Sequence, residues 1–141
     1  MSVQSPAVTL IIGASNNPER YSHQAANKLV LYGHKIVQIG LKNGTVAGQA
    51  ILTEMPKLVD IDTVTLYIGP AHQPDWYEYV LQLKPRRVIF NPGTENAAFA
   101  NLLTQNHIEA TEACTLVLLS IGAYWNLIAY FFFTDDKVSV S

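Results

Sequence analysis

The stretch that decides the fold is residues 8–40, which read VTLIIGASNNPERYSHQAANKLVLYGHKIVQIG. It opens with a β-branched, apolar run that stops at Gly13, a pattern typical of a strand buried on both faces of a parallel sheet. Apolar residues then recur at helical spacing, with Ser22 placed to cap a helix and Gly33 placed to end it. The run KIVQI at residues 35–39 predicts a second strand.

The rest of the chain continues this alternation of strands and helices. Apolar, β-branched runs end at turns rich in glycine and proline, and helical patterns fill the intervals between them. Further strands are predicted at residues 63–68, 87–90 and 107–113, further helices at 74–83 and 94–105, a polar loop at 40–48 and a short helical turn at 55–60. The predicted fold class is therefore α/β, with a doubly wound, mainly parallel, five-stranded sheet and helices on both faces.

The composition is that of one compact domain with a large core. A chain of 141 residues fits a single domain of ordinary size. Hydrophobic residues make up 49% of the chain and charged residues 14%, against about 25% charged residues in an average domain. The net charge of -2 and the lack of a long basic run lead us to expect no nucleic-acid partner.

Cysteine, histidine and acidic residues offer no metal site by their spacing. Cys114 is the only cysteine, so no internal disulfide can form, and the scattered histidines do not have zinc-ligand spacing. Asp60 and Asp62 lie together before a strand, but two acids without a third ligand usually form a solvated turn. We expect no metal and, since the first residues have no basic stretch of a signal peptide, a cytoplasmic protein.

An apolar segment near the C-terminus, residues 116–133, carries no formal charge and approaches the length of a transmembrane helix. Ser120 and Asn126 interrupt it, and no cluster of basic residues flanks it before Lys137. We therefore expect a buried or dimer-packed helix and no membrane association. A symmetric homodimer is the commonest way to cover such a surface.

Turns that end the predicted strands indicate where a ligand binds. In an open parallel sheet, ligands bind beyond the carboxyl ends of the strands, where the strand order reverses. The small residues Gly13, Ala14 and Ser15 after the first strand allow backbone amides to approach an anion. The following helix directs its unpaired N–H groups and the positive end of its dipole to the same place. A phosphate is the expected ligand group.

The first loop does not have the pattern of a dinucleotide site. It reads GASNNPERYSH, without G-x-G-x-x-G, and Gln38, Gly40 and Lys42 near the end of the second strand provide no carboxylate for an NAD ribose. Lys42 is better suited to a further phosphate.

The run IIGASNNPERYSHQAANKLVLYGHKIVQIG resembles the opening of the small bacterial CoA-binding proteins. Their domain is shared with the α-subunit of succinyl-CoA synthetase and with NDP-forming acyl-CoA synthetases. The family pattern, G-A-S-x-x-P-x-x-x-S between a strand and a helix, is matched by Gly13, Ala14, Ser15, Pro18 and Ser22. VIFNPGTEN at residues 88–96 is similar to the family's strand-four turn. The resemblance covers about residues 8–114, the expected core of a single domain over 1–141, and leaves 115–141 as an apolar C-terminal segment.

The resemblance implies a Rossmann-like domain in which the first loop holds the phosphates of coenzyme A. Carried over by position, the phosphate loop consists of Gly13, Ala14, Ser15, Pro18, Arg20 and Ser22. The adenosine or its 3′-phosphate would face Gly40 and Lys42. The remaining groove would be lined by Ile68, Gly69, Pro70, Asn91, Pro92 and Gly93. Where the family commonly has Asn-Pro after the second strand, this chain has Gly40 and Leu41.

The implied function is a stand-alone module that binds CoA or an acyl-CoA and has no catalytic machinery of its own. The synthetases of this family need a phosphorylatable histidine in a second domain, and a chain of 141 residues is too short to contain one. Two alternatives stay open: a structural or regulatory domain that has lost its ligand, and a non-catalytic partner of an acyl-CoA synthetase.

Three other features have both a functional and a structural interpretation. His23, beside the first loop, can bind an anion or pack the helix start. Cys114 can lie near the ligand, but a free cysteine is usually a small buried hydrophobe. The aromatic residues Trp76, Tyr77 and Tyr79 can stack on adenine or pack a helix.

Overall fold

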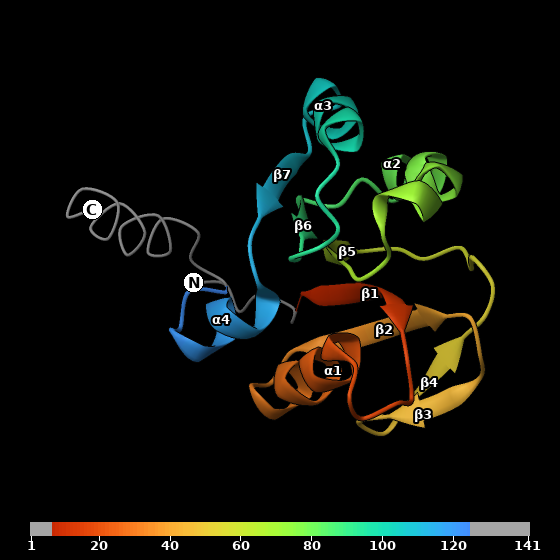
Figure 1. Ribbon diagram of the computed structural model, residues 1–141, viewed down its shortest axis with the longest axis vertical. Coiled ribbons are helices and arrows are strands. Elements are labelled where there is room, and N and C mark those ends of the chain that lie inside the picture. Colours follow the sequence, from red (N-terminus) through yellow and green to blue (C-terminus); the bar gives the residue numbers. More distant parts are fainter. Residues whose placement is uncertain (1–6, 125–141) are drawn as a thin grey trace.

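A mixed sheet covered by helices on both faces forms the body of the protein (Figure 1). The structure is a computed structural model, and it describes residues 7–124. The strands are β1 (Val8–Ala14), β2 (Lys35–Gly40), β3 (Gly44–Val46), β4 (Gln49–Leu52), β5 (Ile61–Leu66), β6 (Arg87–Phe90) and β7 (Glu109–Glu112). The helices are α1 (Tyr21–Leu31), α2 (Tyr77–Leu83), α3 (Ala97–Gln105) and α4 (Thr115–Ser120), with 3₁₀ turns η1 (Pro70–His72) and η2 (Pro74–Trp76).

The strand order is β3-β4-β2-β1-β5-β6-β7. All neighbours in this part of the chain pair in parallel except β3 and β4, which form an antiparallel hairpin at one edge. From β1, the chain builds the sheet first toward β2 and then, through β5, in the opposite direction. The predicted α/β, doubly wound, mainly parallel fold is confirmed, and the order reverses between β1 and β5.

The edge hairpin was not predicted, and the sheet of the described residues has seven strands rather than five. Residues 40–48 were expected to be a loop, but they contain β3. The hairpin turn is Ala47 and Gly48, both with positive φ (54° and 76°), as a tight hairpin requires. Asn-Gly would signal such a turn in a sequence, whereas Ala-Gly does not, and both strands are short.

Two further predictions, for the segment before β5 and for the first residue of β5, differ from the structure. Residues 55–60 form no helix, and Asp60 at the end of this segment has a positive φ of 60°, which a right-handed helix does not allow. The strand itself begins at Ile61, two residues before the predicted start. The strand predicted at residues 87–90 agrees with β6.

Alternate residues of β1 point to opposite faces of the sheet. One core cluster joins this strand to α2 and α3 and includes Leu10, Ile12, Val64, Val80, Phe99 and Leu103. The other joins it to α1 and α4 and includes Ile11, Ala26, Leu29, Ile89, Leu118 and Leu119. Packing of α4 therefore extends the core past residue 114. The rest of the apolar C-terminal segment, residues 125–141, lies outside the described residues.

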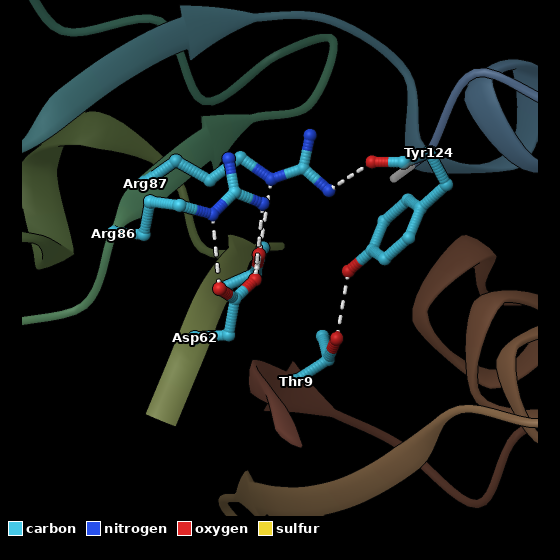
Figure 2. A network of polar contacts seen from close by, with 6 residues as sticks. Thr9, Asp62, Arg86, Arg87 and Tyr124 are labelled. Carbon is cyan, nitrogen blue, oxygen red and sulfur yellow. Dashed lines mark hydrogen bonds and ion pairs between the residues drawn. The ribbon is translucent and has the colours of Figure 1, made fainter. Parts of the chain in front are cut away.

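A buried arginine ties the amino-terminal ends of the strands to the chain that follows α4 (Figure 2). Arg87, the first residue of β6, is fully buried. Its Nε donates to Thr63 Oγ1 (3.0 Å), and its Nη2 donates to the backbone carbonyl of Tyr124. The guanidinium carbon lies 4.5 Å from the centre of the Tyr124 ring, and the Tyr124 hydroxyl is 2.7 Å from Thr9 Oγ1. Burial lowers the pKa of Arg87, but a guanidinium stays charged at neutral pH.

The neighbouring arginine has a different environment. Arg86 is 43% exposed and forms an ion pair with Asp62 at 2.9 Å. Burial of the Asp62 carboxylate would raise its pKa, but hydrogen bonds from Arg86 and Thr63 lower the pKa below its ordinary value. Because this pair is close to solvent, it contributes little to stability.

Replacing the two adjacent arginines separately should therefore have unequal effects on stability. We expect Arg87→Ala to lower the free energy of unfolding by about 3 kcal/mol, because it opens a cavity and leaves the Tyr124 carbonyl without its donor. We expect Arg86→Ala, the matched control, to lower it by less than about 1 kcal/mol. Urea denaturation measures both values, and equal losses would contradict the role given to Arg87.

A buried histidine makes stability depend on pH. His34 is buried, with its ring 4.9 Å from that of Tyr124, and burial and the charge of Arg87 lower its pKa. Between the ordinary pKa of histidine, about 6.5, and the lower folded value, the unfolded chain binds more protons, so stability falls as pH falls. We expect His34→Gln to reduce this loss in urea denaturation between about pH 7 and about pH 5. His72→Gln, at an exposed position, should leave the loss unchanged.

Candidate functional site

A cleft of about 720 Å³ lies at the carboxyl ends of the central strands. Its walls are the loops that follow β1, β2, β5 and β6. The ends of β1 and β5 meet here, where the strand order reverses, which is the position at which open α/β sheets bind ligands.

Close contact between the ends of β1 and β5 requires a glycine at residue 13. Gly13 has φ +97°, and a Cβ atom at this position would lie 2.9 Å from the backbone carbon and oxygen of Tyr67 and from Ile68 Cγ2. Tyr67 N donates to the carbonyl of Ile12 at 2.8 Å and holds the two chains together. The floor of the cleft is therefore backbone, which leaves room for a ligand above it.

Local hydrogen bonds order the loop between β1 and α1. Ser15 Oγ accepts from Asn17 N, and Asn17 Oδ1 accepts from Glu19 N, both at 3.0 Å. His23 Nδ1 lies 3.2 Å from the carbonyl oxygen of Ser15. Because a carbonyl only accepts, Nδ1 must carry the proton of this hydrogen bond. His23 therefore stabilises the loop through this hydrogen bond and does not line the cleft.

The N-terminus of α1 points free donors at the cleft. The N-cap residue, Arg20, forms no side-chain cap, and the first turn has no acidic residue. Within residues 7–124, the backbone N–H groups of Tyr21 and Ser22, which line the cleft, have no acceptor. These N–H groups and the positive end of the helix dipole favour an anion at this point.

Charged side chains add to this preference. Glu19, Arg20 and Lys42 are the charged residues that line the cleft. Neither basic side chain has a hydrogen bond or ion pair with another described residue. The charged side chains that line the cleft therefore carry a net charge of one positive unit.

A tyrosine forms part of the cleft wall. Tyr67 lines the cleft, while its hydroxyl is buried. Burial raises the pKa of this phenol, so it stays neutral. It therefore offers the ligand an uncharged ring.

The structure brings most of the predicted site residues together. Those that line the cleft are Gly13, Ala14, Ser15, Arg20, Ser22, Lys42, Ile68, Gly69, Pro92 and Gly93. Pro18, Gly40, Pro70 and Asn91 do not. A Cβ at Gly40 would collide with the carbonyl of Ala14, so this glycine serves the packing of β2 on β1.

Asn91 is buried and bonded within the protein. Its Nδ2 donates to Thr65 Oγ1 (2.6 Å) and to the carbonyl of Leu66 (2.8 Å), and its Oδ1 accepts from Thr115 N (2.9 Å). The side chain joins β5 and β6 to the start of α4 beneath the cleft.

The prediction omitted several residues of the cleft wall: Asn16, Asn17, Glu19, Tyr21, Leu41, Tyr67 and Thr94. Most of them adjoin predicted residues in the chain, so taking each loop as a whole would have included them. Leu41 is 98% exposed within the cleft wall.

The other candidates lie elsewhere. Tyr77 stacks on Phe99 with ring centres 4.4 Å apart, and Tyr79 donates from its hydroxyl to the carbonyl of Pro56 at 2.6 Å. Trp76 packs edge-on against Tyr79. Cys114 is the N-cap residue of α4 and does not line the cleft.

Residues 7–124 contain no group of three or more His, Cys, Asp or Glu side chains that could hold a metal ion. No helix in the same range has the length and apolar character needed to cross a bilayer.

Comparisons with known proteins identify relatives of this chain. A protein-family model described as a CoA binding domain matches residues 7–120. A crystal structure of an uncharacterized protein has 47% identity and a TM-score of 0.82, over 85% of this chain and 99% of its own. A comparison with curated proteins found no match.

More distant structures share the fold. A Thermus thermophilus protein has a TM-score of 0.73 at 18% identity, over 84% of this chain and 90% of its own. The dinucleotide-forming acetyl-coenzyme A synthetase 1 of Ca. Korarchaeum cryptofilum, in complex with phosphate and ADP, has a TM-score of 0.62 at 13% identity, over 74% of this chain and 25% of its own.

A methyl group at residue 13 should disturb the cleft and destabilise the protein. We expect Gly13→Ala to lower the free energy of unfolding by about 3 kcal/mol, since it combines backbone strain with overlap on Tyr67. Gly33→Ala is the matched control, because Gly33 also has a positive φ (+88°) but open space around it. It should lose about 1 kcal/mol. Equal losses of unfolding free energy in urea denaturation would contradict the prediction that overlap with Tyr67 adds to the cost of a positive φ.

Proposed function

Since this chain belongs to the CoA-binding domain family, we propose that its cleft binds coenzyme A or an acyl-CoA and that the chain acts as a binding module. The observation that carries this proposal is the cluster of donors at the start of α1. The unpaired N–H groups of Tyr21 and Ser22 lie in one cleft with two basic side chains that have no partner among the described residues. A pyrophosphate is complementary to this arrangement.

In this proposal, the pyrophosphate lies over the loop of residues 13–22. Gly13 and Ala14 allow close approach to the backbone, and Arg20 contributes a positive charge at the helix start. The ligand then crosses the floor formed by Ile68 and Gly69. Hydrogen bonds within the loop already hold its shape, so little conformational entropy is lost on binding.

Lys42 and Leu41 are suited to the adenosine end. Lys42, after β2, provides a point charge for the 3′-phosphate. The exposed side chains of Leu41 and Tyr21 line the same cleft and offer apolar surface to the base. The departure from the Asn-Pro pattern thus removes a polar side chain at Gly40, places an apolar side chain at Leu41 and adds no charge.

In this proposal, the cleft binds its ligand and catalyses no reaction of its own. Ser15 and Ser22 line the cleft of the described structure, but no histidine, the commonest general base, lines it beside their hydroxyls. His23 is occupied with the Ser15 carbonyl, and Tyr67 is kept neutral by burial. A cytoplasmic location is part of the proposal, since the single cysteine needs no oxidising compartment.

A negative charge placed in the loop should weaken binding without unfolding the protein. In Ser15→Asp, a carboxylate oxygen can still accept the hydrogen bond from Asn17 N, while its charge repels the pyrophosphate. By isothermal titration calorimetry we expect CoA affinity to fall at least about tenfold, or about 1.4 kcal/mol. Asn101→Asp makes the same charge change at an exposed position on α3, outside the cleft, and should bind as the wild type does.

Thermal melts of both variants check that the fold is intact. Absence of binding heat for the wild-type protein with both CoA and acetyl-CoA would contradict the proposed ligand. Binding of NAD instead would assign the cleft to a dinucleotide.

A further inference from the structure

The chain continues past the domain that its relatives share. The family match ends at residue 120, and the 47% identical crystal structure is covered almost completely by 85% of this chain. Residues 125–133, which read WNLIAYFFF, are apolar except for Asn126. These residues lie outside the described structure, but the point at which the chain reaches them is well defined.

Tyr124, the last residue before this segment, lies next to the C-terminal end of α1. Tyr124 is buried, its carbonyl accepts from Arg87, and its hydroxyl hydrogen bonds to Thr9 (Figure 2). Its ring contacts His34, which follows α1 by three residues. Arg87 and Thr9 thus hold the start of residues 125–133 beside the C-terminal end of α1.

The surface at this place is apolar and exposed. The α1 apolar end, which we define as Val30, Leu31 and Tyr32, has three consecutive exposed hydrophobic residues, with Leu31 77% exposed. Val117, on the neighbouring helix α4, is exposed as well. The two helices are joined by a hydrogen bond of 2.8 Å from Lys28 Nζ to Ser120 Oγ. A surface of this kind typically marks a site of contact.

We propose that residues 125–133 of the same chain pack on the α1 apolar end. Nine residues reach about 30 Å when extended, whereas a helix of 11 residues is about 17 Å long. The segment is therefore long enough to cover this end of the helix. Both partners are apolar, so their contact removes hydrophobic surface from water.

Tethering favours the chain's own segment over that of a second copy. A segment held at its start beside its site has an effective concentration of about millimolar, well above that of the dissolved protein. The homodimer expected from the sequence would need the same apolar residues, so it is the competing occupant. The packing does not involve the cleft, which lies at the other end of α1.

Tryptophan fluorescence tests this proposal in the full chain. The chain has two tryptophans, so in Trp76→Phe the emission reports Trp125 alone. We expect blue-shifted emission relative to the urea-unfolded protein, independent of concentration from about 1 µM to about 100 µM. Adding Leu31→Lys should shift the emission to the red. The matched control is Val59→Lys, at a residue that is 79% exposed in the segment before β5, and it should cause no shift.

A second readout does not depend on the Trp76→Phe background. In the wild-type chain, Leu31→Lys should lower the melting temperature more than Val59→Lys does, because a lysine at an unpacked surface site is nearly neutral. Light scattering measures the oligomeric state of each sample. Emission that is already red-shifted and unaffected by Leu31→Lys would overturn the proposal. A blue shift that appears only with dimer formation, or only with phosphatidylcholine vesicles, would overturn it in favour of a second copy or a lipid surface.

Discussion

The approach of β5 to β1 at Gly13 is the constraint on which the cleft depends. Both strands are buried on both faces, and Tyr67 N donates to the carbonyl of Ile12, so the two backbones cannot separate without losing a ladder bond. With no Cβ and a positive φ at Gly13, the pairing of β1 with β2 shifts register before Ala14, the last residue of the strand, and the chain then leaves the sheet and returns as α1. That turn opens the cleft and aims the helix at it.

The carboxyl ends and the amino ends of the strands, here called the carboxyl edge and the amino edge of the sheet, have different physical roles. At the carboxyl edge, donors are left unpaired at the start of α1, and basic side chains have no partner among residues 7–124. At the amino edge, Arg87 is fully buried and bonded to Thr63 and Tyr124. An unsatisfied polar group is costly inside a protein but useful where a ligand can satisfy it. The free N–H groups of Tyr21 and Ser22 lie in a cleft where a ligand can satisfy them, whereas Nη1 of Arg87 is buried without an acceptor among the described residues.

Much of the fold and of the candidate site follows from local pattern. β-Branched runs of the right length, each followed by glycine or proline, predict parallel strands whose carboxyl ends share one edge. Once that edge is known, Gly13, Arg20 and Lys42 must come together, although Lys42 is more than twenty residues from Arg20 in the chain. The structure places all three in one cleft. Their roles in ligand binding stay predictions.

What the sequence by itself determined was the alternation of strands and helices and therefore the end of the sheet at which the cleft lies, because these depend on periodicity and backbone sterics alone. Only the tertiary structure decided which of two adjacent arginines is buried, that Asn91 bonds inward, and that β3 and β4 pair through Ala47 and Gly48. The physical reason is that side-chain direction at a strand end, and hydrogen bonds between residues far apart in the chain, depend on the pleat and twist of the assembled sheet.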